Sequence, residues 1–285
     1  MKKIYLITHL YNFDDKIRTC QLEEYLKNNF DVSIYMPYRD TKEELIDSNI
    51  WKQEIFKQDI KAIEEADVIL GYIDGLEFDE GIGFEIGYAL SKNKQIILLN
   101  SDFIKYNYAN YDYDIIDPIL DFFNINILKI SHHLDFDNFC DDLVYKKNEL
   151  LKLITKNMIN KQDIHHILDK KVIQQEFFIE TGNSKYFYNL LQNKNVSKRL
   201  VNFNAQEDIK NLLYSKKMFV FANGMQMHFG SAILCGICFG LDIPFYIVDD
   251  KMIYITGKDI MKTNLMIDQA SQGYINIGDF VEKYI

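Results

Sequence analysis

The chain has 285 residues, 48% of them hydrophobic and 26% charged, and a formal net charge of −10 at pH 7. This length is enough for two domains of ordinary size. The negative charge disfavours a general binder of nucleic acid or of acidic membranes, because such proteins gather lysine and arginine to neutralise phosphate. A small, neutral or weakly charged ligand fits better.

Localisation signals are missing from the sequence. Acidic residues interrupt the opening MKKIYLITHLYNFDD too early for a signal peptide, and the apolar run 232–241 is too short to span a membrane. We therefore expect a cytoplasmic protein without a membrane partner. Cys235 and Cys238 lie in an apolar run with no second metal-ligand pair, so we expect buried thiols and no metal site.

Apolar segments alternate with amphipathic segments along the first half of the chain. This pattern predicts a parallel sheet covered on both faces, in an open α/β sandwich of the flavodoxin or Rossmann type. Residues 101–125 are rich in Tyr, Asn and Asp and are predicted to form a loop or lid, and 160–171 a linker. We expect strands at 2–8, 31–37, 66–74, 94–100 and 125–130, and helices at 15–29, 51–65, 82–92 and 136–159.

Part of the second half aligns with part of the first half without a gap. KQDIKAIEEADVILGYIDG aligns with QEDIKNLLYSKKMFVFANG, and FDEGIGFEIGYALSKNKQIILL aligns with MHFGSAILCGICFGLDIPFYIV. Every aligned pair is 149 positions apart, as Asp59 and Asp208 are. A constant offset with retained glycines and apolar residues predicts an internal duplication of the α/β fold.

The acids, unlike the glycines, differ between the copies. His228 stands where the first copy has Asp79, and Leu234 stands where it has Glu85. Because the glycines persist where Glu85 is lost, we interpret them mainly as packing positions between helix and sheet. The spacing GxGxxxG after a later strand also differs from the dinucleotide-binding GxGxxG, and nearby carboxylates would repel phosphate.

The acids of the first copy are candidates for chemistry. Asp79 and Glu85 follow a predicted strand and would lie at the carboxyl edge of the sheet, where open α/β folds bind ligands. Glu85 is expected in the first turn of its helix, where the dipole favours the ionised form. Paired carboxylates that divide the roles of nucleophile and proton donor cleave glycosidic bonds, and Asp59 or Asp79 could be the partner of Glu85.

Four segments resemble the nucleoside 2-deoxyribosyltransferase family, in the family's order and over about residues 1 to 145. The segments are KKIYL with Tyr5, QDIKAIEEAD with Asp59, DEGIGFEIGYA with Asp79 and Glu85, and NILKIS with Asn126. The interval from Asp59 to Asp79 to Glu85 also resembles that of the family. The resemblance implies an enzyme, a pentosyltransferase, that acts on a deoxynucleoside and a free nucleobase in nucleotide salvage without a cofactor.

The resemblance also implies a role for each residue. Glu85 would attack the anomeric carbon and hold deoxyribose as an ester, and Tyr5 would orient Glu85. Asp59 would transfer the proton of the departing and the incoming base. Asp79 would hold a sugar hydroxyl, and Asn126 resembles a residue that reaches a neighbouring subunit's site. We further expect Gly81 and Gly83 to bind substrate.

The domain assignment and the alternatives follow from the same comparison. We expect a catalytic domain at 1–158 and a degenerate, non-catalytic repeat at 159–285, assembled as a homo-oligomer or as a pseudo-dimer within one chain. One alternative is an N-glycoside hydrolase of deoxynucleosides or deoxynucleotides, although Asp79 would repel a 5′-phosphate. Another is a non-catalytic nucleoside or nucleotide sensor.

Overall fold

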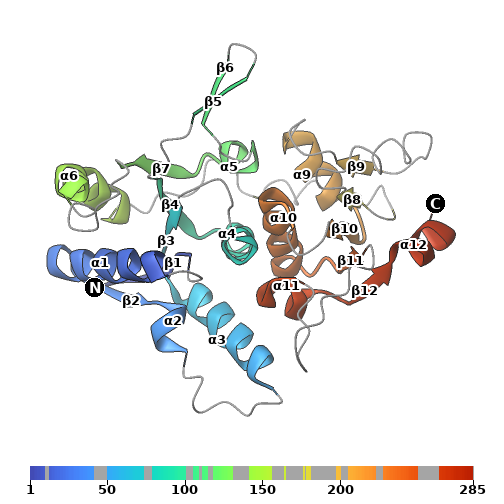
Figure 1. Ribbon diagram of the computed structural model, residues 1–285, viewed down its shortest axis with the longest axis horizontal. Coiled ribbons are helices and arrows are strands. Elements are labelled where there is room, and N and C mark those ends of the chain that lie inside the picture. Colours follow the sequence, from blue (N-terminus) through green and yellow to red (C-terminus); the bar gives the residue numbers. More distant parts are fainter. Residues whose placement is uncertain are drawn as a thin grey trace.

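The structure is a computed structural model, and helices and strands are named as in Figure 1. Among the described residues no helix is long and apolar enough to cross a membrane. The residues described are 1–9, 13–41, 50–73, 79–100, 105–108, 111–114, 118–130, 141–155, 164, 176, 178–180, 197–199, 205–222, 227–249 and 263–284.

The first half forms a five-stranded parallel sheet in the order β2-β1-β3-β4-β7. Its strands are β1 (Lys2–Ile7), β2 (Val32–Tyr35), β3 (Val68–Ile73), β4 (Gln95–Asn100) and β7 (Asn126–Lys129). The helices of this half are α1 (Phe13–Asn29), α2 (Pro37–Asp40), α3 (Trp51–Glu65), α4 (Glu80–Ser91), α5 (Pro118–Phe122) and α6 (Asp141–Thr155). All residues of β3 and β4 are buried, as expected for central strands covered on both faces.

The second half forms another five-stranded parallel sheet, in the order β9-β8-β10-β11-β12. Numbered along the chain, both sheets therefore have the strand order 2-1-3-4-5, which is that of flavodoxin-like folds. The strands are β8 (Phe178–Glu180), β9 (Ser197–Arg199), β10 (Met218–Ala222), β11 (Phe245–Asp249) and β12 (Tyr274–Asn276). The helices are α9 (Ala205–Leu213), α10 (Phe229–Gly240), α11 (Leu265–Ala270) and α12 (Ile277–Tyr284).

The prediction of an α/β fold with parallel sheets is confirmed, but the loop predicted at 101–125 is wrong. That segment contains an antiparallel hairpin of β5 (Lys105–Tyr108) and β6 (Tyr111–Asp114), followed by α5. The tyrosines of KYNY and YDYD alternate with polar residues, which is the period of a strand, and the polar composition of the segment hid this signal. The linker expected at 160–171 lies outside the described residues except for Ile164.

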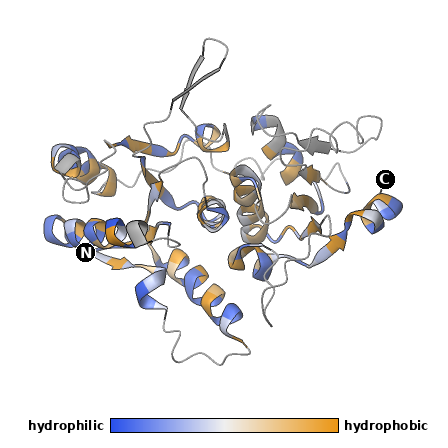
Figure 2. Ribbon diagram, in the orientation of Figure 1, coloured by the Kyte–Doolittle hydropathy of each residue, from blue (hydrophilic) through white to orange (hydrophobic). Residues whose placement is uncertain are grey.

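Helices α4 and α10 pack side by side between the two sheets (Figure 1). One apolar cluster runs from β3 and β4 through both helices to β10 and β11. Figure 2 shows the hydrophobic colouring of these central elements. The thiols of Cys235 and Cys238 on α10 are buried in this cluster, as the sequence predicts. The two halves thus share a continuous core.

The glycines of α4 and α10 pack helix against helix, so the interpretation that they pack a helix on its sheet is wrong. A Cβ atom at Gly87 would collide with the Ile233 carbonyl oxygen of α10, and one at Gly236 would collide with the Phe84 carbonyl oxygen of α4. Only glycine allows the two backbones to approach so closely.

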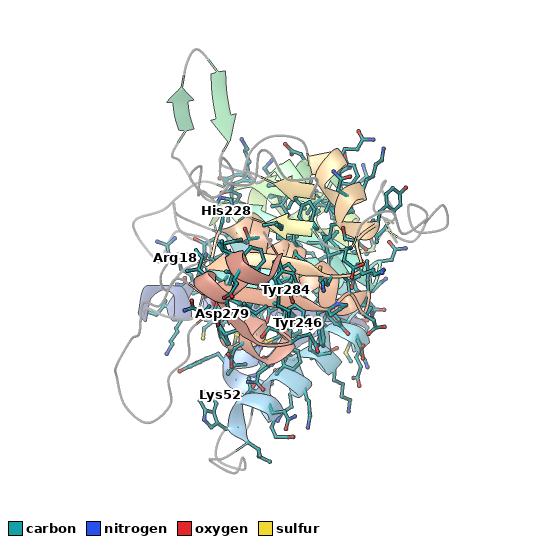
Figure 3. All side chains as sticks on the ribbon, turned by 90° about the vertical axis from the view of Figure 1, so that its right-hand side faces the viewer. Arg18, Lys52, His228, Tyr246, Asp279 and Tyr284 are labelled. Atoms are coloured by element: carbon teal, nitrogen blue, oxygen red, sulfur yellow. The ribbon has the colours of Figure 1, made fainter. Side chains whose placement is uncertain are left out.

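The outer faces of the sheets carry separate apolar clusters. Helices α1 and α6 cover the outer face of the first sheet. On the second sheet Phe219 and Phe221 pack under Phe280 of α12, with Phe219 also against Tyr284. Tyr246 and Tyr284 lie on this face in Figure 3, which views the molecule from the side of the second half. Each sheet is therefore covered on both faces.

Candidate active site

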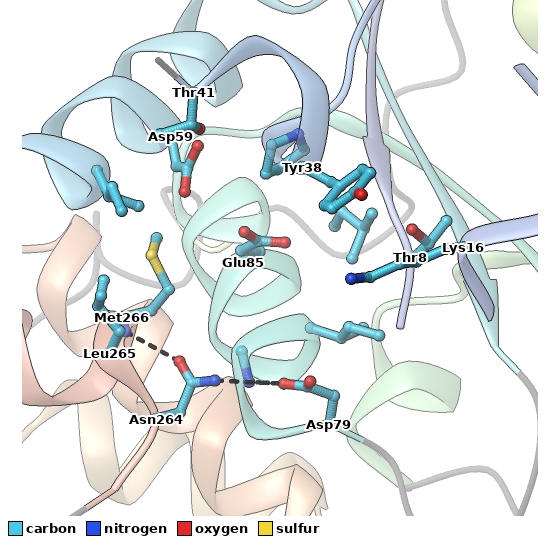
Figure 4. Close-up of a pocket in the computed structure, with 15 residues that line it drawn as sticks. Thr8, Lys16, Tyr38, Thr41, Asp59, Asp79, Glu85, Asn264, Leu265 and Met266 are labelled. Atoms are coloured by element: carbon cyan, nitrogen blue, oxygen red, sulfur yellow. Dashed lines mark hydrogen bonds between the residues drawn. The ribbon is translucent and has the colours of Figure 1, made fainter. Parts of the chain in front are cut away.

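A cavity of about 450 Å³ opens at the carboxyl edge of the first sheet (Figure 4). Its size is that of a small-molecule site. Thr8 follows β1, Tyr38 lies on α2 after β2, and Asp79 precedes α4 after β3, so the ends of three neighbouring strands supply its walls. This is the edge at which open α/β sheets bind ligands.

Glu85 lies on the cavity wall and is held from behind by Tyr5. Tyr5 is fully buried on β1, and its hydroxyl donates a hydrogen bond of 2.7 Å to Oε1 of Glu85. Helix α4 begins at Glu80, two residues earlier than predicted, so Glu85 is its sixth residue and lies beyond the first turn. The expected support of its charge by the helix dipole is therefore weak, since that effect fades after the first turn.

Asp59, on α3, lines the same cavity and has a tyrosine partner of its own. The Tyr35 hydroxyl donates a hydrogen bond of 3.0 Å to Oδ1 of Asp59. Tyr5 and Tyr35 are paired in register on neighbouring parallel strands, and their rings stack with centroids 5.4 Å apart. Residues in register project to the same face, so two stacked phenols present their hydroxyls to two different carboxyls.

Burial controls the protonation of both carboxyls. It raises the pKa of Asp59 to about 7, although the hydrogen bond from Tyr35 opposes the rise. It also raises the pKa of Glu85 well above its usual value, and the charge of Asp59 raises it further, while the hydrogen bond from Tyr5 lowers it. Both carboxyls therefore keep their protons to higher pH than exposed carboxyls do, and the charge of Asp59 disfavours ionisation of Glu85. The expectation that the helix dipole holds Glu85 as an anion is not supported.

Asp79 is the N-cap of α4. Its Oδ1 accepts a hydrogen bond of 2.5 Å from the backbone N–H of Gly81 and one of 3.4 Å from Nδ2 of Asn264. At the aligned position, His228 caps α10 by accepting through Nδ1 from the N–H of Gly230. The cap is thus present in both halves, while a carboxylate is present in one.

The second half of the chain supplies part of the cavity wall. Asn264, Leu265 and Met266, at the start of α11, line the cavity opposite the β1 end (Figure 4). Helix α11 contacts both α3 and α4. The cavity therefore lies between the two halves and is not contained in the first.

The structure brings four of the predicted site residues to this cavity. Asp59, Asp79, Gly81 and Glu85 line it, and Tyr5 lies directly behind Glu85. Their roles in catalysis and substrate binding stay predictions.

Two predicted residues lie elsewhere. Gly83 faces Phe229 and Ala232 of α10, so its backbone packs helix on helix and does not line the cavity. Asn126 opens β7 at the amino edge of the sheet, opposite the cavity edge. Because the expected role of Asn126 concerns another subunit's site, it stays a prediction that this cavity does not use.

Several residues at or behind the cavity are not predicted from the sequence, among them Tyr35, Thr8 and Asn264. Tyr35 was read as a strand residue, although its register with Tyr5 follows once the two strands are neighbours. Thr8 lines the cavity 7% exposed, and its Oγ1 has no hydrogen-bond partner among the described residues. A polar residue directly after an apolar strand could have drawn attention to it. Asn264 has no comparable signal in the sequence.

The first half of the chain is similar to known proteins. The family model described as Nucleoside 2-deoxyribosyltransferase matches residues 4–167. The nucleoside deoxyribosyltransferase of Lactobacillus johnsonii (strain CNCM I-12250 / La1 / NCC 533) is 29% identical over 131 residues, which are 42% of this chain and 82% of that protein. That of Lactobacillus leichmannii is 33% identical over 63 residues, 22% of this chain and 40% of that protein.

Two solved structures are also similar. The 2-deoxyribosyltransferase of the psychrotolerant bacterium Bacillus psychrosaccharolyticus has 21% identity and a TM-score of 0.36, with 48% of this chain and 88% of that chain covered. The 2-desoxiribosyltransferase of Leishmania mexicana has 17% identity and a TM-score of 0.32, with 52% and 98% covered.

Proposed function

Because this chain belongs to the nucleoside 2-deoxyribosyltransferase family, a family of pentosyltransferases, we propose that it transfers 2-deoxyribose between nucleobases through a covalent ester on Glu85. One observation carries the proposal. Two buried carboxyls, Glu85 and Asp59, face one cavity of nucleoside size, and each accepts a hydrogen bond from its own tyrosine. Division of one proton between two carboxyls is the arrangement that cleavage of a glycosidic bond needs.

In the first half-reaction, Oε2 of ionised Glu85 attacks the anomeric carbon while the bond from that carbon to the base breaks. Oε1 is held by Tyr5, whose phenol stays protonated because burial raises its pKa. Asp59 donates its proton to the leaving base, so the base departs neutral. The products are a free base, ionised Asp59 and a glutamyl ester of deoxyribose.

In the second half-reaction, a ring nitrogen of the incoming base attacks the anomeric carbon and the ester bond breaks. The carboxylate of Asp59 takes the proton from that nitrogen, and Glu85 leaves as an anion. Each step inverts the carbon, so the two together retain its configuration. Lack of a 2-hydroxyl eases formation of the oxocarbenium-like state, so that an ionised carboxylate can capture it.

The substrate proposed is a free nucleoside and not a 5′-monophosphate. Asp79 is a carboxylate at the cavity wall and would repel a phosphate there. Its hydrogen bonds with the described residues use Oδ1, so we propose that Oδ2 accepts from a sugar hydroxyl.

The second half is proposed to be a degenerate repeat at 159–285 that takes the place of a partner subunit beside the catalytic domain at 1–158. Support comes from the shared strand order of the two sheets and from the exact 149-residue offset between α4 and α10. Leu234, the counterpart of Glu85, is fully buried on α10. A repeat of this kind supplies packing surface and no second catalytic site.

The test is a transfer assay on the purified chain. Deoxyinosine is incubated with and without free adenine, and the products are separated by chromatography. Formation of deoxyadenosine supports transfer. Release of hypoxanthine that does not depend on adenine would indicate a hydrolase instead, and binding without turnover would indicate a sensor. Full activity of the Glu85→Ala variant would overturn the proposed mechanism.

A further inference from the structure

We infer that Asn264, contributed by the second half, is a positioning residue that holds Asp79 in the orientation needed to bind a sugar hydroxyl of the substrate. The inference rests on the proposed function. It assigns the second half a direct part in the site, although that half has lost the carboxylate that would correspond to Glu85.

The contact between Asn264 and the start of α4 is close and specific. Nδ2 of Asn264 donates to Oδ1 of Asp79 at 3.4 Å, and Oδ1 of Asn264 accepts from the N–H of Met266 at 2.9 Å, capping α11. A Cβ atom at Gly81 would lie 2.8 Å from Nδ2 of Asn264. Glycine at 81 thus leaves the room that the amide occupies.

Glu80 fixes the segment that carries Asn264. Its buried carboxyl accepts hydrogen bonds from the Thr263 hydroxyl at 2.8 Å and from the backbone N–H of Asn264 at 3.2 Å. It also accepts from the backbone N–H of Met227, just before α10. One side chain of α4 therefore holds two segments of the second half, and Asn264 reaches Asp79 from a fixed backbone.

The consequence is a defined orientation for the Asp79 carboxylate. Gly81 and Asn264 both donate to Oδ1, from the helix and from the opposite wall. Two donors on one oxygen restrict rotation of the carboxylate, and no other described residue takes up Oδ2, which can accept from the ligand. Asp79 in turn is at the cavity wall beside Glu85, so its orientation sets where the sugar lies relative to the attacking oxygen.

The test is Asn264→Ser in the full chain. Serine retains an N-cap oxygen for α11 but cannot reach Asp79, and it adds no charge. The matched control is Asn276→Ser, because Asn276 likewise accepts from a backbone N–H, that of Gly278 at 2.9 Å, and does not line the cavity. We expect KM for deoxyinosine to rise about three- to tenfold in Asn264→Ser, the size of one lost hydrogen bond, with kcat within about twofold.

Analogues lacking one hydroxyl sharpen the test. The inhibition constants of 2′,3′-dideoxyinosine and 2′,5′-dideoxyinosine are measured with both variants. One of the two analogues should bind wild type and Asn264→Ser equally, because it lacks the hydroxyl that Asp79 holds. Unchanged KM in Asn264→Ser, or an equal loss for all three ligands, would overturn the inference. Should Asn264→Ser fail to fold, Asn264→Asp carries the same expectation, because it keeps the shape and the N-cap oxygen but has no N–H to donate to Asp79.

Failure of the inference and failure of the proposed function give different results. Binding of deoxyinosine to the Glu85→Gln protein, measured by calorimetry with and without Asn264→Ser, reports on Asn264 without turnover. A wild-type protein that transfers deoxyribose while Asn264→Ser binds like wild type overturns the inference alone. A wild-type protein that does not transfer overturns the proposed function, and weaker binding in Asn264→Ser would then still support the role of Asn264.

Discussion

Helices α4 and α10 occupy the same position in two sheets of the same strand order, yet they face different demands. Both begin with a side-chain cap, from Asp79 and His228, and both approach the other through glycines. On α4 a carboxylate, Glu85, reaches a cavity, whereas the aligned Leu234 on α10 is fully buried. Close packing between the helices therefore constrains the sequences of both, whereas only α4 has a carboxylate at the cavity.

The two halves also differ in how many acidic side chains they bury, and burial of a carboxyl lowers the free energy of unfolding. The first half holds Asp59, Glu80 and Glu85 at 4–8% exposure. Burying a carboxyl without full compensation costs stability, and among the described residues only the first half has buried acids.

The largest effect is expected at Glu85. Glu85→Gln keeps the volume and the hydrogen bond to Tyr5 but removes the nucleophile, so kcat for transfer should fall about 1,000-fold or more. Leu234→Met, the control at the aligned position of α10, should leave kcat within about twofold. Rapid-quench or steady-state assays with deoxyinosine and adenine measure both. Restoration of activity to a Glu85→Ala protein by Leu234→Glu would contradict the view that the second site has been dismantled at several positions.

The next effect concerns the glycines between the helices. Gly87→Ala places a methyl group against the Ile233 carbonyl, so we expect the free energy of unfolding to fall by about 3 kcal/mol or more. The control is Gly278→Ala on α12, where the nearest atom is the side-chain oxygen of Asn276 at 3.2 Å, and a loss below about 1 kcal/mol is expected. Urea unfolding monitored by circular dichroism compares them. Equal losses would argue against close packing of α4 on α10.

A third effect depends on pH through Asp59. Its pKa rises from 3.8 to about 7 on folding, so its contribution to stability is present below about pH 4 and is lost as pH rises through about 7. Asp59→Asn removes the ionisable group, and at pH 8 it should stabilise the fold by up to about 4 kcal/mol, with little change at pH 4. The exposed Asp279 on α12 provides the control Asp279→Asn. Chemical unfolding at both pH values measures the difference, and a stabilisation independent of pH would refute the assignment.

Asp59→Asn should also abolish proton transfer to the base while it stabilises the protein. In the wild type, kcat/KM should fall as pH rises above about 7, because the leaving base needs the proton of Asp59. A profile flat from pH 6 to 9 would contradict this role.

The smallest effect is expected at Tyr35. Its hydroxyl lowers the pKa of Asp59, so Tyr35→Phe should move the basic limb of kcat/KM to higher pH and reduce kcat about threefold. Tyr25→Phe is the control, because the Tyr25 hydroxyl donates to the Leu143 carbonyl under α6, outside the cavity. A pH profile of Tyr35→Phe identical to that of Tyr25→Phe would show that the hydroxyl does not act on Asp59.

Local features of the fold could be predicted from the sequence because they repeat along the chain. Helix α3 was predicted at its observed bounds, and β3 and β4 within two residues, since continuous apolar runs alternate with amphipathic ones. The hairpin of β5 and β6 was missed because its polar composition suggested a loop. Glu85 could be predicted as a candidate because Leu234 replaces it in the second copy, whereas Asp59, which aligns with Asp208, was a candidate as a partner carboxylate and through the family resemblance.

Features that depend on docking could not be predicted. The helix-on-helix role of Gly87 needs the other half in place, and Asn264 joins the site only because α11 packs on α4. The raised pKa of Glu85 likewise comes from burial and from the charge of Asp59, which the position of Glu85 in its helix did not indicate. A single sequence contains no periodicity from which such contacts follow.

The hydrogen bond from Thr263 to Glu80 joins residues 183 positions apart. A ribosome adds residues in order, so the carboxyls of the site are made long before the wall that encloses them. Until residues 263–266 emerge, the cavity beside α4 lacks one wall, although α10 can already cover Gly83 and Gly87. Loops closed over such distances form slowly. Competence to bind substrate should therefore be the last property that the growing chain acquires.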